Sequence, residues 1–181
     1  MDDSRDGEYS RFPEIEDLIK LCRSLNEHQV RYLLIGGYAV ILRGFARTTK
    51  DVDLLVDAST ENVGKIKTAL AYLPDNAVSQ VENDELGQVA VIRVADEFVI
   101  DLMAKACGID YQAAVQEREY LKLGDVQVPI PSVPMLIRMK ATDRPGDALD
   151  VEFLKTLLKK EKERAAVAPQ TGWRCFKKLF F

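Results

Sequence analysis

The sequence predicts a mixed α/β (α+β) domain, and three observations support this fold class. Short apolar runs that favour β-structure alternate with longer segments in which apolar residues recur at helical spacing. No internal repeat or long linker interrupts the alternation. Apolar residues make up 47% of the 181 residues, enough to build a buried core. We therefore expect a mixed β-sheet flanked by helices, followed by a helical C-terminal segment.

The first third of the chain is expected to form two helix–strand pairs. Residues 1–12 are polar, and we expect them to be a flexible N-terminus. Apolar residues then recur at helical spacing from Pro13 to about residue 29. We then expect a buried strand at 30–35, a short helix at 38–44 and a second strand at 51–56.

The rest of the chain continues the mixed pattern. Ser59 or Thr60 can cap a helix that runs to about Leu73, and the polar residues 74–86 are expected to form a loop. Two strands are expected at 88–94 and 97–103, followed by a short helix at 109–117. A β-hairpin is expected at 119–123 and 126–130, and two helices at 132–141 and 147–164. We expect one domain over residues 13–158 and a separate basic helix end and tail over 159–181.

Charge excludes one class of function. The chain carries 25 basic and 29 acidic residues, and a net charge of −4 argues against a generally basic nucleic-acid binder. Residues 155–181 nevertheless carry a net charge of +6, and Trp173, Phe176 and Phe180 lie among the basic residues. This tail either contacts an acidic partner such as tRNA or is a solvated helix end that docks on its own domain or on a second subunit of a homodimer.

The cysteines and the N-terminus predict a reduced, cytoplasmic protein. Cys22, Cys107 and Cys175 form no C-x-x-C pair, and we expect the first two in the core. The chain starts without the apolar segment of a signal peptide, and no run of about 18 apolar residues could span a membrane. His28 is the only histidine, which argues against histidine-dependent triads and histidine-rich zinc sites.

Two carboxylates in one strand form the first candidate site. Alternation along 51–56 places Asp51 and Asp53 on one face of the strand and the neighbouring apolar side chains on the other. Two like charges side by side are stabilised by a cation, and carboxylate oxygens suit Mg²⁺, which also recruits substrate phosphates. The alternative for an isolated D-x-D pair is the exposed edge of a strand.

The preceding segment favours the metal. Gly36 and Gly37 follow an apolar strand and precede a helix, so the backbone there can approach a ligand closely and present N–H groups to an anion. Arg47, Thr48 and Thr49 add a cation and two hydroxyls before the carboxylate pair. Together these residues predict a site for a metal-bound phosphate.

The combined pattern resembles a known signature. Gly36-Gly37-Tyr-Ala followed by Arg47-Thr-Thr-Lys-Asp51-Val-Asp53-Leu-Leu-Val resembles the nucleotidyltransferase superfamily typified by DNA polymerase β. It is most similar to the small bacterial branch of minimal nucleotidyltransferases, antibiotic nucleotidyltransferases and abortive-infection toxins. The resemblance covers about residues 14–158, with the signature at 33–56. It implies the nucleotidyltransferase fold and the transfer of a nucleoside monophosphate from an NTP such as ATP to an acceptor hydroxyl.

The resemblance also implies further site residues. Asp101 matches the third carboxylate that this family brings from a neighbouring strand, and burial of an aspartate in the apolar run 98–103 is costly unless it is paired or metal-bound. A surface-facing residue or a structural cap is the alternative, and Asp96 competes for the role, although a turn explains Asp96. Lys140 and Arg144 match phosphate-binding positions. Arg144 could instead pair with Asp147 or Asp150 in an ion-paired helix junction.

These residues receive roles in one expected reaction. Asp51 and Asp53 would hold one or two Mg²⁺ ions, with Mn²⁺ as the alternative, and Asp101 would help to hold the second ion or accept a proton. The phosphate-binding residues would be Gly36, Gly37, Arg47, Thr49, Lys140 and Arg144. Two alternatives remain: a toxin-like nucleotidyltransferase that modifies RNA or protein and is neutralised by an antitoxin, and a non-catalytic nucleotide-binding regulatory module.

Overall fold

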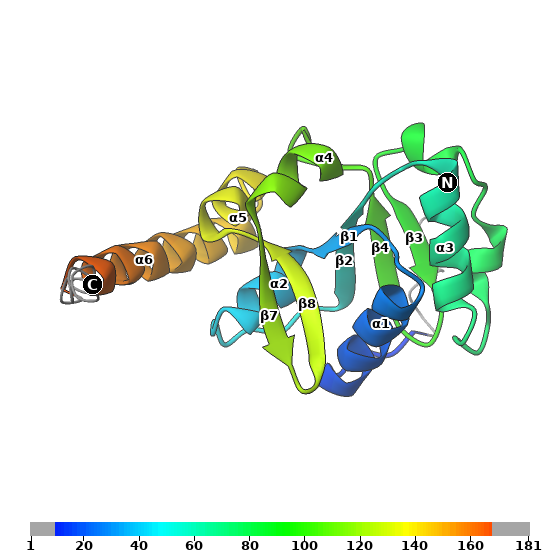
Figure 1. Cartoon of the computed structure of the whole chain (residues 1–181), viewed down its shortest axis with the longest axis horizontal. Helices are drawn as coiled ribbons and strands as arrows, with labels where there is room; N and C mark the ends of the chain where they lie inside the picture. Colours follow the sequence, from blue (N-terminus) through cyan, green and yellow to red (C-terminus); the bar gives the residue numbers. More distant parts are fainter. Residues whose placement is uncertain (1–9, 168–181) are drawn as a thin grey trace, which may run out of the picture.

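A computed structural model of the chain describes residues 10–167 and contains a four-stranded mixed sheet (Figure 1). The strands are β1 (Tyr32–Leu34), β2 (Asp51–Val56), β3 (Ile92–Ala95) and β4 (Val99–Met103), and their order across the sheet is β1-β2-β4-β3. β2 and β4 are parallel, whereas β1 and β3 each pair antiparallel with their neighbour. The two parallel strands at the centre carry the three aspartates of the candidate site.

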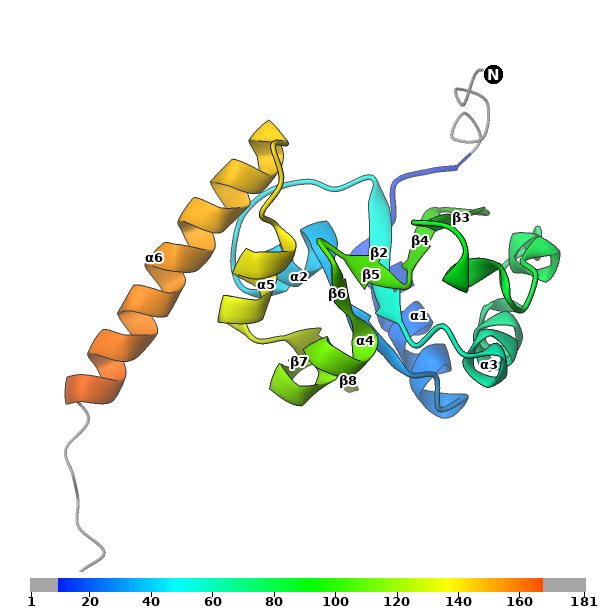
Figure 2. The same cartoon turned by 90° about the horizontal axis from the view of Figure 1, so that it is seen from above.

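One face of the sheet packs against α1 (Ile15–Glu27) and α3 (Thr60–Leu70), both of which Figure 2 shows on the same side. Val52, Leu54 and Val56 point into this core. Because side chains alternate along a strand, Asp51 and Asp53 project from the opposite face, together with Leu55. Burial of one face of β2 therefore fixes the direction of the carboxylates on the other.

The face that carries the carboxylates is bordered by three helices. These are α2 (Gly36–Leu42), α5 (Val133–Met139) and the start of α6 (Pro145–Val167), which share a small core that includes Leu154. Phe45 stacks on Phe153 with ring centroids 4.7 Å apart and fixes α6 against the loop before β2. The rest of α6 extends away from the sheet (Figures 1 and 2).

A separate hairpin closes one edge of the domain. β7 (Arg118–Leu123) and β8 (Val126–Pro131) pair antiparallel, and β8 supplies Val126, Val128 and Ile130 to the core beneath the sheet. This confirms the expected strand pair. Its turn contains Gly124, which has a positive φ of 61°. The expected helix caps are also present, since the side chains of Ser59 and Ser132 accept hydrogen bonds from backbone N–H groups at the starts of α3 and α5.

The structure corrects several expected elements. The expected loop at 74–86 contains the 3₁₀ turn η1 (Ala77–Gln80). A second 3₁₀ turn, η2 (Glu85–Gly87), begins within the loop and ends one residue after it. An additional hairpin, β5 (Lys105–Ala106) with β6 (Ile109–Asp110), precedes α4 (Tyr111–Ala114) and η3 (Val115–Glu117). Its turn holds Cys107 at a φ of 48°, and this cysteine is exposed rather than in the core, unlike Cys22.

Parts of the predicted termini lie outside the described residues. These are residues 1–9 of the expected flexible N-terminus and residues 168–181 of the basic tail, with its three aromatic residues. Within the described range, no helix is long and apolar enough to cross a membrane.

Candidate active site

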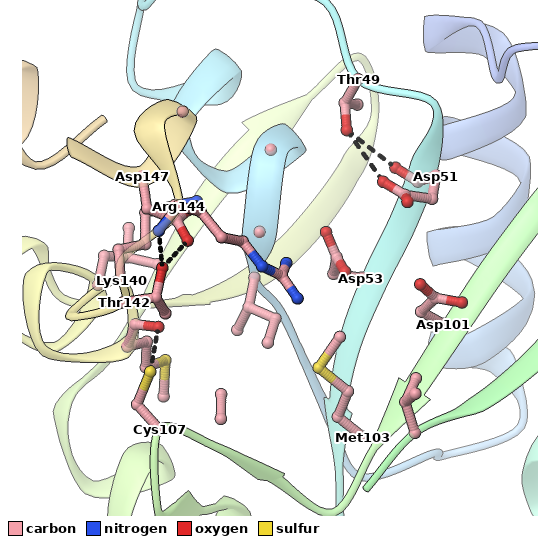
Figure 3. Close-up of a pocket in the computed structure, with 18 of the residues that line it drawn as sticks. Thr49, Asp51, Asp53, Asp101, Met103, Cys107, Lys140, Thr142, Arg144 and Asp147 are labelled. Atoms are coloured by element: carbon pink, nitrogen blue, oxygen red, sulfur yellow. Dashed lines mark hydrogen bonds and ion pairs between the residues drawn. The ribbon is translucent and has the colours of Figure 1, made fainter. Parts of the chain in front are cut away.

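Three aspartates lie side by side on the two central strands. Asp53 on β2 is the direct register partner of Asp101 on β4, and Asp51 lies two residues before Asp53 on the same face. The Asp101 side chain is 6% exposed, whereas that of Asp51 is 30% exposed. The parallel pairing of β2 with β4 thus brings together the carboxylates that the sequence separates by almost fifty residues (Figure 3).

Asp53 is the most perturbed of the three. Burial and the nearby charges of Asp51 and Asp101 raise its pKa to about 6, and a backbone N–H of Gly37 opposes the shift. Gly36 has a φ of 61°, and a Cβ atom built on it would lie 1.8 Å from Oδ2 of Asp53. Only glycine therefore allows the start of α2 to approach this carboxylate.

Thr49 supports the first carboxylate. Its hydroxyl donates to Oδ1 of Asp51 at 3.1 Å. A Cβ atom on Gly37 would lie 2.6 Å from Oγ1 of Thr49, so the second glycine makes room for this threonine. The glycine pair thus contacts the carboxylate strand directly, a role that the sequence reading did not assign to it.

Arg93 is a site residue that the sequence reading missed. It is the register partner of Asp101 on β3, and its Nε and Nη2 donate to the two oxygens of Asp101 at 3.0 and 2.9 Å. Its Nη2 is also 4.0 Å from Oδ2 of Asp51. A charged residue between Ile92 and Val94 in an apolar strand was the available sequence signal.

The opposite wall is a network of ion pairs. Lys140 contacts Asp147 at 2.9 Å and Asp150 at 2.7 Å, and Arg47 contacts the same oxygen of Asp150 at 2.5 Å. Asp150 is 1% exposed, and its Oδ1 has no hydrogen-bond partner among the described residues. Burial would raise the pKa of Asp147, but hydrogen bonds from Thr142 and Lys140 lower it. The ion-paired helix junction thus exists, with Lys140 and Arg47 as its cations.

Arg144 differs from the other cations. Its side chain makes no hydrogen bond or ion pair with the residues that the structure describes, so it does not pair with Asp147 or Asp150 as the sequence allowed. Figure 3 shows it extending from the segment between α5 and α6 into the pocket. Such a cation is available to an anionic ligand.

Apart from the buried Asp150, the residues described above line one pocket. Its volume is about 510 Å³, which is typical of small-molecule sites. Its lining includes every residue that the sequence singled out for catalysis or phosphate binding: Gly36, Gly37, Arg47, Thr49, Asp51, Asp53, Asp101, Lys140 and Arg144. The structure therefore places the sequence-derived set in a single cavity.

The competing candidate Asp96 has a structural role. It is 3% exposed and accepts backbone N–H groups from Asp75, Ala77 and Glu97 at 3.1, 3.0 and 2.8 Å. A carboxylate that holds three backbone donors fixes the loop after α3. Asp96 therefore belongs to the turn rather than to the pocket.

Two of the three carboxylates are placed to hold a divalent cation. Asp51 and Asp53 present oxygen ligands, and a cation would offset the burial and the neighbouring negative charges that raise the pKa of Asp53. Asp101 instead accepts two hydrogen bonds from Arg93. Among residues 10–167, no cluster of three or more acidic, histidine or cysteine side chains has the arrangement of a metal site. The residues thus fit a cation on Asp51 and Asp53, with Asp101 adjacent.

Solved structures share this architecture. One is a protein from Thermotoga maritima described as a candidate nucleotidyltransferase, with 13% identity, a TM-score of 0.51, and coverage of 84% of this chain and 91% of that chain. Another is the lincosamide antibiotic adenylyltransferase LnuA in its lincomycin-bound form, with 17% identity, a TM-score of 0.57, and coverage of 82% and 99%. No protein-family model and no curated protein sequence matches the chain. The structural likeness shows that this chain has the nucleotidyltransferase fold.

Proposed function

We propose that the protein is a divalent-metal-dependent nucleotidyltransferase that transfers a nucleoside monophosphate from an NTP to an acceptor hydroxyl. The observation that carries the proposal is the placement of Asp51, Asp53 and Asp101 on adjacent parallel strands, in one pocket with four cationic side chains. Carboxylates and cations together suit a metal-bound triphosphate, because the acids hold the metal and the bases hold phosphate oxygens.

In the proposed reaction, the acceptor oxygen attacks the α-phosphorus of the NTP and loses its proton. The bond between the α-phosphorus and the oxygen that bridges to the β-phosphate breaks, and pyrophosphate leaves. A bound Mg²⁺ or Mn²⁺ ion would neutralise charge on the triphosphate. Asp51 and Asp53 would hold that ion, and Asp101 lies close enough to them to join it or to accept the proton.

The cationic wall would bind the phosphates. Arg144 has no ion-pair partner among the described residues and reaches into the pocket, so it can bind an anion without breaking an existing pair. Lys140 and Arg47 are oriented by the buried Asp150, which fixes them beside the pocket. The N–H group of Gly36 lies beside the carboxylates and would contact the phosphate nearest to the ion. The N–H of Gly37 and the hydroxyl of Thr49 bond Asp53 and Asp51 in this structure and would reach the same phosphate by exchanging those bonds.

One structural neighbour suggests which donor and acceptor to test first. LnuA is named as an adenylyltransferase, which makes ATP the first NTP to test. Its named acceptor, a lincosamide, is a small molecule, and we include small molecules, RNA such as tRNA, and protein as acceptor classes. A cytoplasmic protein would have all three available. If the acceptor is RNA or protein essential for growth, expression should arrest growth, and an antitoxin partner encoded by a neighbouring gene should relieve the arrest.

The experiment is incubation of the purified protein with each α-labelled NTP, Mg²⁺ and a cell extract, followed by identification of the labelled product. The proposal predicts label in an acceptor and release of pyrophosphate, with D51N as the inactive control. Binding of Mg²⁺-NTP in a calorimeter without any transfer would instead identify a non-catalytic regulatory module.

A further inference from the structure

The guanidinium of Arg93 engages both carboxylate oxygens of Asp101, the third aspartate of the site. Arg93, Asp101 and Asp53 are successive register partners across β3, β4 and β2. Both oxygens of Asp101 accept from Arg93, and the same guanidinium lies 4.0 Å from Asp51. One arginine therefore contacts two of the three carboxylates on the face that borders the pocket.

Asp101 and Arg93 differ in how far their side chains are exposed to solvent. Asp101 is almost fully buried, with a side chain 6% exposed, whereas the Arg93 side chain is 51% exposed. A buried carboxylate without a counter-charge is costly, and the planar guanidinium matches both of its oxygens. The half-exposed arginine is therefore the partner that a competing cation would displace, because the aspartate is fixed on an inner strand.

A divalent cation and Arg93 need the same oxygens. A metal ion bound by Asp101 uses lone pairs that now accept N–H groups, and it places positive charge where the guanidinium lies.

We infer that Arg93 is a positioning residue that competes with a divalent cation for Asp101, so that Asp101 joins the metal only after Arg93 is displaced. The inference rests on the proposed function, because it concerns the same site. In the resting protein, Arg93 holds Asp101 in place, and Asp51 with Asp53 forms the initial metal site. Displacement leaves the guanidinium at the mouth of the pocket, where it can contact an anionic substrate.

The test is the Mn²⁺ dissociation constant in the absence of nucleotide, measured by calorimetry. We expect Arg93→Gln to tighten Mn²⁺ binding roughly tenfold, because a competing charge is removed. Arg93→Lys keeps the charge but engages Asp101 through a single head group, so it should tighten binding less. In an Asp101→Asn background, Arg93→Gln should tighten binding much less, because the contested ligand is gone and only the charge 4.0 Å from Asp51 is removed.

Arg23→Gln is the matched control, since Arg23 forms an exposed ion pair with Asp125 at 2.7 Å on another part of the surface. It should leave Mn²⁺ binding unchanged. If Arg93→Gln does not fold by circular dichroism, Arg93→Lys still tests the inference, and binding no tighter than wild type would contradict it.

Two failures are distinguishable. If the wild type binds Mn²⁺ and transfers nucleotide but Arg93→Gln binds no more tightly, or if the full tightening persists in the Asp101→Asn background, only the inference is wrong. If no variant binds Mn²⁺ and the wild type transfers nothing, the proposed function is wrong and the inference falls with it.

Discussion

Asp53 and Asp101 are direct register partners on two parallel strands, and burial together with the charges of Asp51 and Asp101 raises the pKa of Asp53 to about 6. Since the ordinary value is 3.8, the folded protein keeps this proton at pH values where the unfolded chain has lost it. The associated stability is fully present below the unfolded pKa and is lost as the pH rises through about 6. The carboxylate cluster therefore destabilises the metal-free protein at neutral pH.

Asp53→Asn should consequently stabilise the metal-free protein. We expect its free energy of unfolding at pH 8 to rise by about 1–3 kcal/mol, because a neutral amide does not incur the cost of the buried charge. At pH 4.5 the gain should be much smaller, since wild-type Asp53 is then protonated. Urea denaturation in EDTA at the two pH values measures the difference, and an equal or lower stability at pH 8 would contradict the assignment.

The same pKa predicts how metal binding depends on pH. A metal binds the ionised carboxylate, so protons compete with the cation below about pH 6. The apparent Mn²⁺ affinity should fall by roughly tenfold for each unit below that value. Calorimetric titrations at pH 7.5, 6.5 and 5.5 check this, and an affinity that is flat over the range would exclude Asp53 as a principal ligand.

Gly36→Ala should damage the site through the backbone. A Cβ at this position lies 1.8 Å from Asp53 Oδ2, and the φ of 61° disfavours any L side chain. We expect a loss of more than about 1 kcal/mol of stability, together with weaker metal binding. Gly64→Ala is the control: this helical glycine has open space around it, and alanine there should add about 0.5–1 kcal/mol.

Asp150→Ala should show that the cationic wall depends on one buried carboxylate. Its removal leaves Lys140 with Asp147 alone and Arg47 without this partner, at a cost of about 3–5 kcal/mol. NTP affinity should fall as well, because Lys140 and Arg47, the two proposed phosphate-binding groups, lose their orientation. Glu163→Ala, which removes an exposed partner of Lys159 at 3.9 Å, should change stability by less than about 0.5 kcal/mol. Similar losses in the two variants would refute the role of Asp150.

Asp96 and Asp101 can be separated by kinetics. Asp96→Ala removes an acceptor of three backbone N–H groups and should lower the melting temperature, while the folded fraction keeps its kcat. Asp101→Ala should lower kcat in protein that remains folded. If loss of Asp96 reduced kcat as much as loss of Asp101, the assignment of the third carboxylate would be wrong.

The strands and the carboxylates could be predicted because their signals are local. Alternation along β2 reports its buried face, and the sequence reading gave its bounds as the structure has them, 51–56. The pairing of Arg47 with Asp150 could not be predicted, since 103 residues separate them and only tertiary packing joins them. Arg93 likewise depends on the register of β3 with β4. The β5–β6 hairpin was missed because its strands have two residues each and its turn lacks an Asn-Gly or Asp-Gly pair.

The most direct measurement of the central claim is transfer of label from an α-labelled NTP by wild-type protein and by the Asp51→Asn/Asp53→Asn double variant. Both would be assayed with Mg²⁺ and the acceptor found in the extract, and circular dichroism would confirm that both are folded. We predict metal-dependent labelling and pyrophosphate release by the wild type, both abolished in the folded double variant. Undiminished labelling by the double variant would contradict the account.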